Sequence, residues 1–140
     1  MARIMNTFDP DRDIENAKAL TSVFGVWPSF HDAEIIELVL RRGPVVPSLE
    51  CLIHVFESTG EVDQKGYHVL KNHVLVRLQF ADIRLHDLAD FNHQNVIYEL
   101  VISSGSKAER FSVAISTSFG CEAHFDCNAI AVVSVESFTE

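Results

Sequence analysis

The chain has 140 residues, the size of one ordinary domain, and we expect a single domain over residues 1–140. Hydrophobic residues make up 47% and charged residues 22% of the sequence, a composition that excludes an intrinsically disordered chain. The formal net charge is −9, and so acidic a surface repels nucleic-acid phosphates and anionic membranes, so neither is an expected partner.

The N-terminal part contains the one segment with a clear helical pattern. Apolar residues recur at helical spacing within Asp13–Phe24, at positions Ile14, Ala17, Leu20, Val23 and Phe24. Gly25 supplies a left-handed stop after this segment, and Pro28 prevents the helix from resuming. Because the pattern is amphipathic, we expect the helix to lie on a sheet.

From Glu34 onward the apolar residues alternate with polar ones, which is typical of β-strands. We expect about seven strands, within the segments 34–40, 49–55, 74–80, 96–102, 111–116, 121–126 and 129–136. Ile83–Asn95 is ambiguous, since Leu85, Leu88 and Phe91 fit a short helical turn in a polar loop. The predicted fold class is α+β, with the N-terminal helix packed on a mostly antiparallel, strongly bent sheet or a partial barrel.

Chemically special residues are densest between the helix and the first strand. The group consists of Trp27, Pro28, Ser29, Phe30, His31, Asp32 and Glu34. One interpretation is an acid–base pair or a metal site formed by His31, Asp32 and Glu34. We favour a structural interpretation, in which Trp27 and Phe30 anchor the crossover in the core. His31 and Asp32 would then bond to backbone groups, because neighbours in an extended chain point to opposite sides and form no dyad.

A second group of polar residues lies on one predicted strand. Glu122, His124 and Asp126 alternate with apolar residues, so the period of a strand places them on one face. Such a row could supply two ligands to a metal ion, completed by His31, His54 or His73. The favoured interpretation is the solvent face of a hairpin strand, since no known metal-ligand spacing is present. We therefore expect neither a metal nor another cofactor.

Two segments resemble a known family. The opening segment Phe24-Gly-Val-Trp-Pro-Ser-Phe-His-Asp-Ala-Glu-Ile35 is similar to the first motif of the immunity protein 50 family. The closing segment Phe119-Gly-Cys-Glu-Ala-His-Phe-Asp-Cys-Asn128 is similar to that family's last hairpin. These are small proteins encoded beside polymorphic toxins in bacteria. The resemblance implies an α+β fold, no enzymatic activity and tight binding to a cognate protein toxin.

The predicted function is therefore a non-catalytic immunity protein that neutralises its toxin by occlusion. The charge suits a toxin with a basic substrate groove, such as a nuclease, because an acidic inhibitor is steered toward it. A loop and strand rich in acids offer a candidate docking edge, formed by Asp82, Asp87, Asp90 and Glu99. The alternative is a small metal-dependent hydrolase or ligand-binding domain using His31, Asp32, His124 and Asp126.

The expected compartment is the cytoplasm. The chain starts without an apolar signal segment, and no apolar run approaches the roughly 20 residues of a membrane span. The three cysteines, Cys51, Cys121 and Cys127, form an odd and low count. Such a count is typical of reduced thiols in a reducing compartment.

Overall fold

Alternating side chains build nine strands that join in one sheet. The computed structural model describes residues 7–105 and 108–138. The strands are β1 (Ile14–Glu15), β2 (Glu34–Arg41), β3 (Ser48–Val62), β4 (His68–Ala81), β5 (Arg84–Ala89), β6 (Val96–Ser104), β7 (Phe111–Phe119), β8 (Glu122–Cys127) and β9 (Ala129–Ser137). Their order in the sheet is β1-β9-β4-β3-β2-β6-β7-β8-β5, and all neighbours are antiparallel except β1 and β9.

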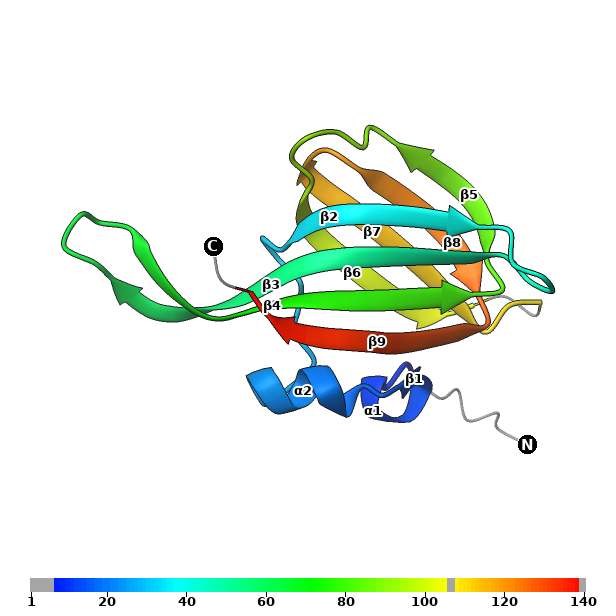
Figure 1. Ribbon diagram of the computed structural model, residues 1–140, viewed down its shortest axis with the longest axis horizontal. Helices are drawn as coiled ribbons and strands as arrows, with labels where there is room; N and C mark the ends of the chain where they lie inside the picture. The colour runs from blue at the N-terminus through cyan, green and yellow to red at the C-terminus, as the bar shows by residue number, and fades with distance from the viewer. Residues whose placement is uncertain (1–6, 106–107, 139–140) are drawn as a thin grey trace.

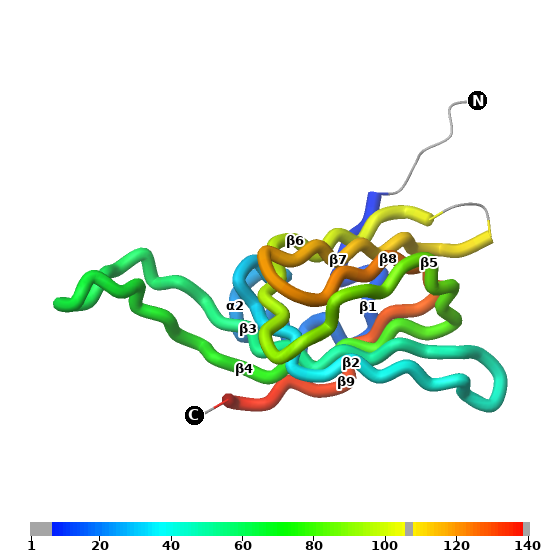
Figure 2. Tube along the Cα trace, turned by 90° about the horizontal axis from the view of Figure 1, so that it is seen from above, coloured from blue at the N-terminus to red at the C-terminus, as the bar shows by residue number. Residues whose placement is uncertain are grey.

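The sheet doubles over into two layers that face each other (Figures 1 and 2). Strands β1, β9, β4, β3 and β2 form one layer, and β6, β7, β8 and β5 form the other. Among the described residues, strand pairing between the two layers consists of one residue pair, Glu34 of β2 with Val96 of β6. The edge strands β1 and β5 do not pair with each other, so the sheet remains open and forms no closed barrel.

The hydrophobic core fills the space between the layers. The rings of Phe80 on β4 and Phe125 on β8 meet edge to face, with centroids 5.0 Å apart. Both side chains are fully buried, and so are Ile53 of β3 and Val113 of β7. The apolar residues of the period-two pattern therefore point inward from both layers, which leaves the intervening polar residues on two outer faces.

The predicted fold class is wrong. Strands hold 60% of the described residues and helices hold 8%, so the chain is mostly β and not an α+β fold with a packed N-terminal helix. The helices are α1 (Pro10–Asp13) and α2 (Lys18–Phe24). Ile14 and Glu15 are extended because they pair with β9, and Asn16 takes a left-handed φ of 61° that breaks the helical pattern. The short α2 lies beside β9 (Figure 1).

The ambiguous segment Ile83–Asn95 contains a strand, β5, followed by an irregular loop over residues 90–95, and it forms no helical turn. Leu85 pairs with Phe125 and Leu88 pairs with Ala123, and a β-bulge lies between the two pairs. Because His86 is the extra residue of the bulge, Leu85 and Leu88 lie on the same side of the strand although they are three positions apart in the sequence. That spacing imitates the period of a helix in the sequence.

The β3–β4 hairpin extends well beyond the layers. We call residues 57–70 the arm; it projects as a twisted two-stranded ribbon (Figures 1 and 2). Register shifts between Val55 and Glu57 and between Ser58 and Val62 accompany its departure from the body. The polar stretch that separates two strands in the sequence is thus a continuation of both strands.

Candidate functional site

The segment between α2 and β2 forms the corner where the two layers join. Backbone hydrogen bonds tie it to β6 and to the residue before it. Ile97 N–H donates to the carbonyl of Ala33 at 2.8 Å, and Asp32 N–H donates to the carbonyl of Ile97 at 2.9 Å. Ile35 N–H donates to the carbonyl of Asn95, also at 2.9 Å. The segment between α2 and β2 therefore connects the two layers where the sheet bends.

The aromatic residues of this corner pack together. Phe30 is 2% exposed, while Trp27 is half-buried and packs against the edge of the core. Their ring centroids lie 5.6 Å apart in an edge-to-face arrangement. Phe30 has a left-handed φ of 63°, which is strained for a residue with a bulky side chain. Burial of the ring offsets that strain.

His31 and Asp32 lie on the solvent side of the corner. The Nδ1–H of His31 donates to the carbonyl of Tyr98 at 2.8 Å, which fixes the ring against β6. His31 Nε2 lies 3.6 Å from Asp32 Oδ1. We expected the two side chains to point apart, and this was wrong because Asp32 has a left-handed φ of 69° and is not extended.

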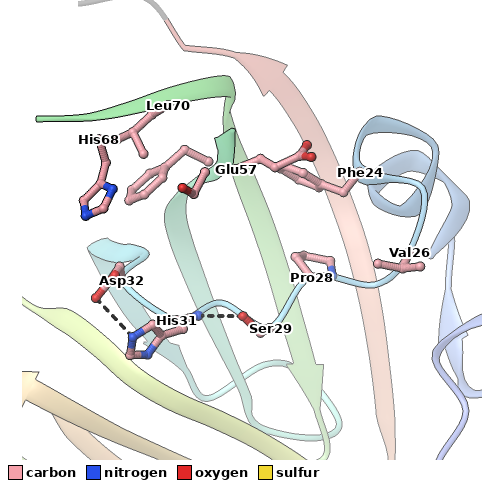
Figure 3. A pocket seen from close by; sticks show the side chains of 11 residues that line it. Phe24, Val26, Pro28, Ser29, His31, Asp32, Glu57, His68 and Leu70 are labelled. Carbon is pink, nitrogen blue, oxygen red and sulfur yellow. Dashed lines mark hydrogen bonds and ion pairs between the residues drawn. The ribbon is translucent and has the colours of Figure 1, made fainter. Parts of the chain in front are cut away.

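A cavity of about 480 Å³ opens between the corner and the base of the arm (Figure 3). Its walls are made by Phe24, Val26, Pro28, Ser29, His31, Asp32, Phe56, Glu57, Ser58, His68 and Leu70. One wall comes from the end of α2 and the corner, and the other from β3 and β4 (Figure 3). The cavity therefore lies where the arm leaves the body.

A buried asparagine that the sequence patterns did not reveal locks the β5–β6 connection to the corner. Asn95 is 1% exposed, and its Oδ1 accepts from the N–H groups of Asn92 and Cys121, each at 3.0 Å. Its Nδ2 donates to the carbonyls of Asn92, at 2.8 Å, and Ile35, at 3.4 Å. A lone Asn in a polar loop carries no periodic signal, so its neighbours in the fold cannot be read from the sequence.

The row on β8 lies at the outer side of its layer. Glu122 and His124 are exposed and Asp126 is partly buried, in alternation with buried Ala123 and Phe125. His86 Nε2 lies 2.6 Å from Asp126 Oδ2, and this hydrogen bond is the main cause that lowers the pKa of Asp126 below its usual value. The His86 and His124 rings lie 5.0 Å apart.

The residues of the alternative hydrolase or ligand site belong to two separate clusters. His31 and Asp32 contact each other at the corner, whereas His124 and Asp126 both contact His86 on β5. Within residues 7–105 and 108–138, no group of three or more His, Cys, Asp or Glu side chains is arranged to hold a metal ion.

The acids of the predicted docking edge fall in different places. Asp87 on β5 and Glu99 on β6 are exposed. They pair with the exposed residues His124 and Ser116, so both acids lie on the outer side of the second layer. Asp90 is exposed in the loop after β5. Asp82 lies at the crossing from β4 to β5, where its Oδ2 accepts a hydrogen bond from Asn128 Nδ2 at 2.8 Å.

Residues 16–138 match the family model of immunity protein 50. The chain belongs to the immunity protein 50 family. The match begins just before α2 and covers the corner, the cavity, the arm and every strand from β2 to β9. No curated protein and no solved structure matches the chain.

Membership of the immunity protein 50 family confirms the resemblance of the two terminal motifs. The first motif forms the corner, and the second forms the end of β7, the turn at Gly120 and β8. The two motifs meet in space, since Asn95 bonds both to Ile35, the last residue of the first motif, and to Cys121 within the second. No helix in the described part of this immunity protein is long and apolar enough to cross a bilayer.

Proposed function

We propose that this immunity protein binds a cognate toxin of a bacterial polymorphic toxin system and neutralises it by occlusion, without catalysis of its own. The observation that carries the proposal is the family match over residues 16–138. Immunity proteins are in general not enzymes. A protein of this kind acts through a surface that covers the toxin's active site, so its affinity depends on how well the two surfaces match in shape and charge.

The outer side of the second layer offers such a surface. We call it the β5–β8 face, and its exposed acids are Asp87, Glu99 and Glu122, whereas Asp126 on the same side is partly buried and bonded to His86. None of these three carboxylates forms a hydrogen bond or an ion pair with another described residue. Small side chains, Ala114 and Ser116, lie between them on the central strand β7.

The charge of the protein supports a basic toxin as the partner. The formal net charge of −9 produces a field that accelerates encounter with a positively charged surface. A nuclease with a basic substrate groove is one toxin of this description. The three cysteines are free and buried, as is typical of a reducing compartment, so we place the encounter in the cytoplasm.

Co-expression tests this function. Bacteria that express the toxin encoded beside this gene should survive only when the immunity protein is present, and an unrelated toxin should still kill them. The purified pair should form a stable complex with one copy of each protein. If the toxin remains fully active with an excess of the immunity protein, the proposed function is wrong.

A further inference from the structure

The arm exposes apolar side chains that nothing in the body covers. Val62 is 57% exposed and Tyr67 is 68% exposed, and both lie near its tip. A two-stranded hairpin with no packed face is at best marginally stable in water, and the core of the protein ends at Val55 and Val74. Tyrosine is enriched at protein–protein interfaces, and a partner that bound the arm would bury the exposed side chains of Val62, Tyr67 and Leu70.

The cavity at the base of the arm is apolar with acidic groups. Val26 and Pro28 line it from the corner, and Leu70 lines it from the arm. Asp32 and Glu57 are the carboxylates among the described lining residues, and no Lys or Arg belongs to that lining (Figure 3). Apolar walls with a few polar groups are the common character of binding sites.

These carboxylates retain capacity for a cation. Asp32 contacts His31, which carries a positive charge only when protonated. Glu57 accepts a hydrogen bond from Asn72 through Oε2, and its Oε1 lies as far as 3.8 Å from the ammonium of Lys71. A carboxylate accepts several hydrogen bonds, so each still has room for a donor from a bound segment. A cationic side chain is therefore the charged group that the cavity would favour.

We propose that the arm and the cavity together grip a protruding segment of the toxin that carries a Lys or Arg beside apolar residues. The inference rests on the proposed function and adds a second contact to it, distinct from the β5–β8 face. A second copy of this chain is a poorer occupant, because the net charge of −9 makes two copies repel. The cation would lie near Asp32 and Glu57, and the apolar residues of the segment would lie against Val26, Leu70 and Tyr67.

Shortening the arm tests one half of this inference. In the shortened variant, Asn-Gly replaces residues 59–69, because Ser58 and Leu70 are paired and a two-residue turn can join them. The core residues Val55 and Val74 remain, so the melting temperature should stay close to that of the wild type. The affinity for a catalytically inactive form of the toxin encoded beside this gene should fall about tenfold or more.

A charge at the cavity tests the other half. Val26→Lys introduces a cation at the rim, where Val26 is 68% exposed and the substitution has little effect on folding. Val45→Lys is the matched control, because it makes the same change in net charge. Val45 is 89% exposed and lies in the β2–β3 connection, at the end of β3 opposite the arm. Val26→Lys should bind the same toxin about tenfold or more weakly than Val45→Lys.

The inference stands only if the shortened variant binds the toxin more weakly than the wild type and Val26→Lys binds it more weakly than Val45→Lys. Wild-type affinity in the shortened variant, or equal affinity for Val26→Lys and Val45→Lys, would overturn it. A wild-type protein that does not bind the toxin has a different meaning, since that result contradicts the proposed function itself.

Discussion

Asn128 Nδ2 donates a hydrogen bond to Asp82 Oδ2 at 2.8 Å, and this contact joins two crossings between the layers of the sheet. Asp82 lies between β4 and β5, and Asn128 lies between β8 and β9. Asn128 N–H also donates to the carbonyl of Ala81, and its Oδ1 accepts from Arg110 N–H at 2.8 Å. The side chain of Asp82, whose backbone has a left-handed φ of 57°, is thus fixed by its hydrogen bond with Asn128 and has a structural role.

Asp82→Lys should therefore affect stability more than binding. Loss of the hydrogen bond from Asn128 should lower the free energy of unfolding by about 1–2 kcal/mol, measured by urea denaturation. Asp87→Lys is the comparison, because it makes the same charge change on the exposed β5–β8 face and should leave stability within about 0.5 kcal/mol. A binding defect in Asp82→Lys as large as that in Asp87→Lys, with unchanged stability, would place Asp82 in the interface.

Phe30 should contribute more to stability than Trp27. Phe30→Ala removes a fully buried ring and should cost about 3–5 kcal/mol, whereas Trp27→Ala should cost about 1–3 kcal/mol because the indole is only half-buried. Thermal and urea denaturation of the two variants measures the difference. A larger loss for Trp27 than for Phe30 would contradict the packing described at the corner.

The cysteines should not react in the folded protein. Burial raises the pKa of Cys51 and of Cys127 to about 12, and it also raises the pKa of Cys121. The reactive thiolate is therefore scarce at pH 8. Iodoacetamide followed by mass spectrometry should find no labelled cysteine in the native protein and three in urea. Rapid native labelling of any one of them would show that its strand opens to solvent.

The hydrogen bond between His86 and Asp126 should make stability fall at acid pH. Because the pKa of Asp126 is lowered in the folded protein, its contribution is present above the ordinary value of ~3.9 and is lost as pH falls through the lower folded value. His86→Ala should raise the pKa of Asp126 and flatten the decline in stability below about pH 4. His93→Ala, at an exposed loop histidine, should leave that decline unchanged. Identical curves for wild type and His86→Ala would contradict this account.

The sequence was informative where each strand has one buried face. The alternation of Val74, Val76, Leu78 and Phe80 with mostly polar residues predicted the second half of β4 and its inward side, because burial on one face produces the period of two. It failed for β5, where the bulge at His86 gives apolar residues a spacing of three. It failed also in the arm, where neither face packs against the core and the few apolar residues, among them Val62 and Tyr67, follow no period of two.

The candidate site was less predictable than the strands. The terminal motifs identified the family, and the structure brings the two motifs together through Asn95. The left-handed residues Phe30 and Asp32 could not be foreseen, because neither residue type requires that conformation. The cavity depends on the arm, and a polar stretch gives no sign that two strands continue through it.

Association rates test the central claim that an acidic surface of this immunity protein binds a basic toxin. The face variant Asp87→Lys, Glu99→Lys, Glu122→Lys is compared with the control Glu15→Lys, Glu37→Lys, Glu136→Lys. Both change the charge equally, and the control acids are exposed away from the β5–β8 face.

Stopped-flow association with the inactive toxin at about 0.01 M and about 0.15 M salt is the decisive measurement. The account predicts that the wild-type rate falls steeply with salt. The face variant should associate more slowly than the control at low salt, and its rate should depend less on salt, because the attractive field at the docking surface is weaker. Equal low-salt rates for the face variant, the control and the wild type would contradict the claim.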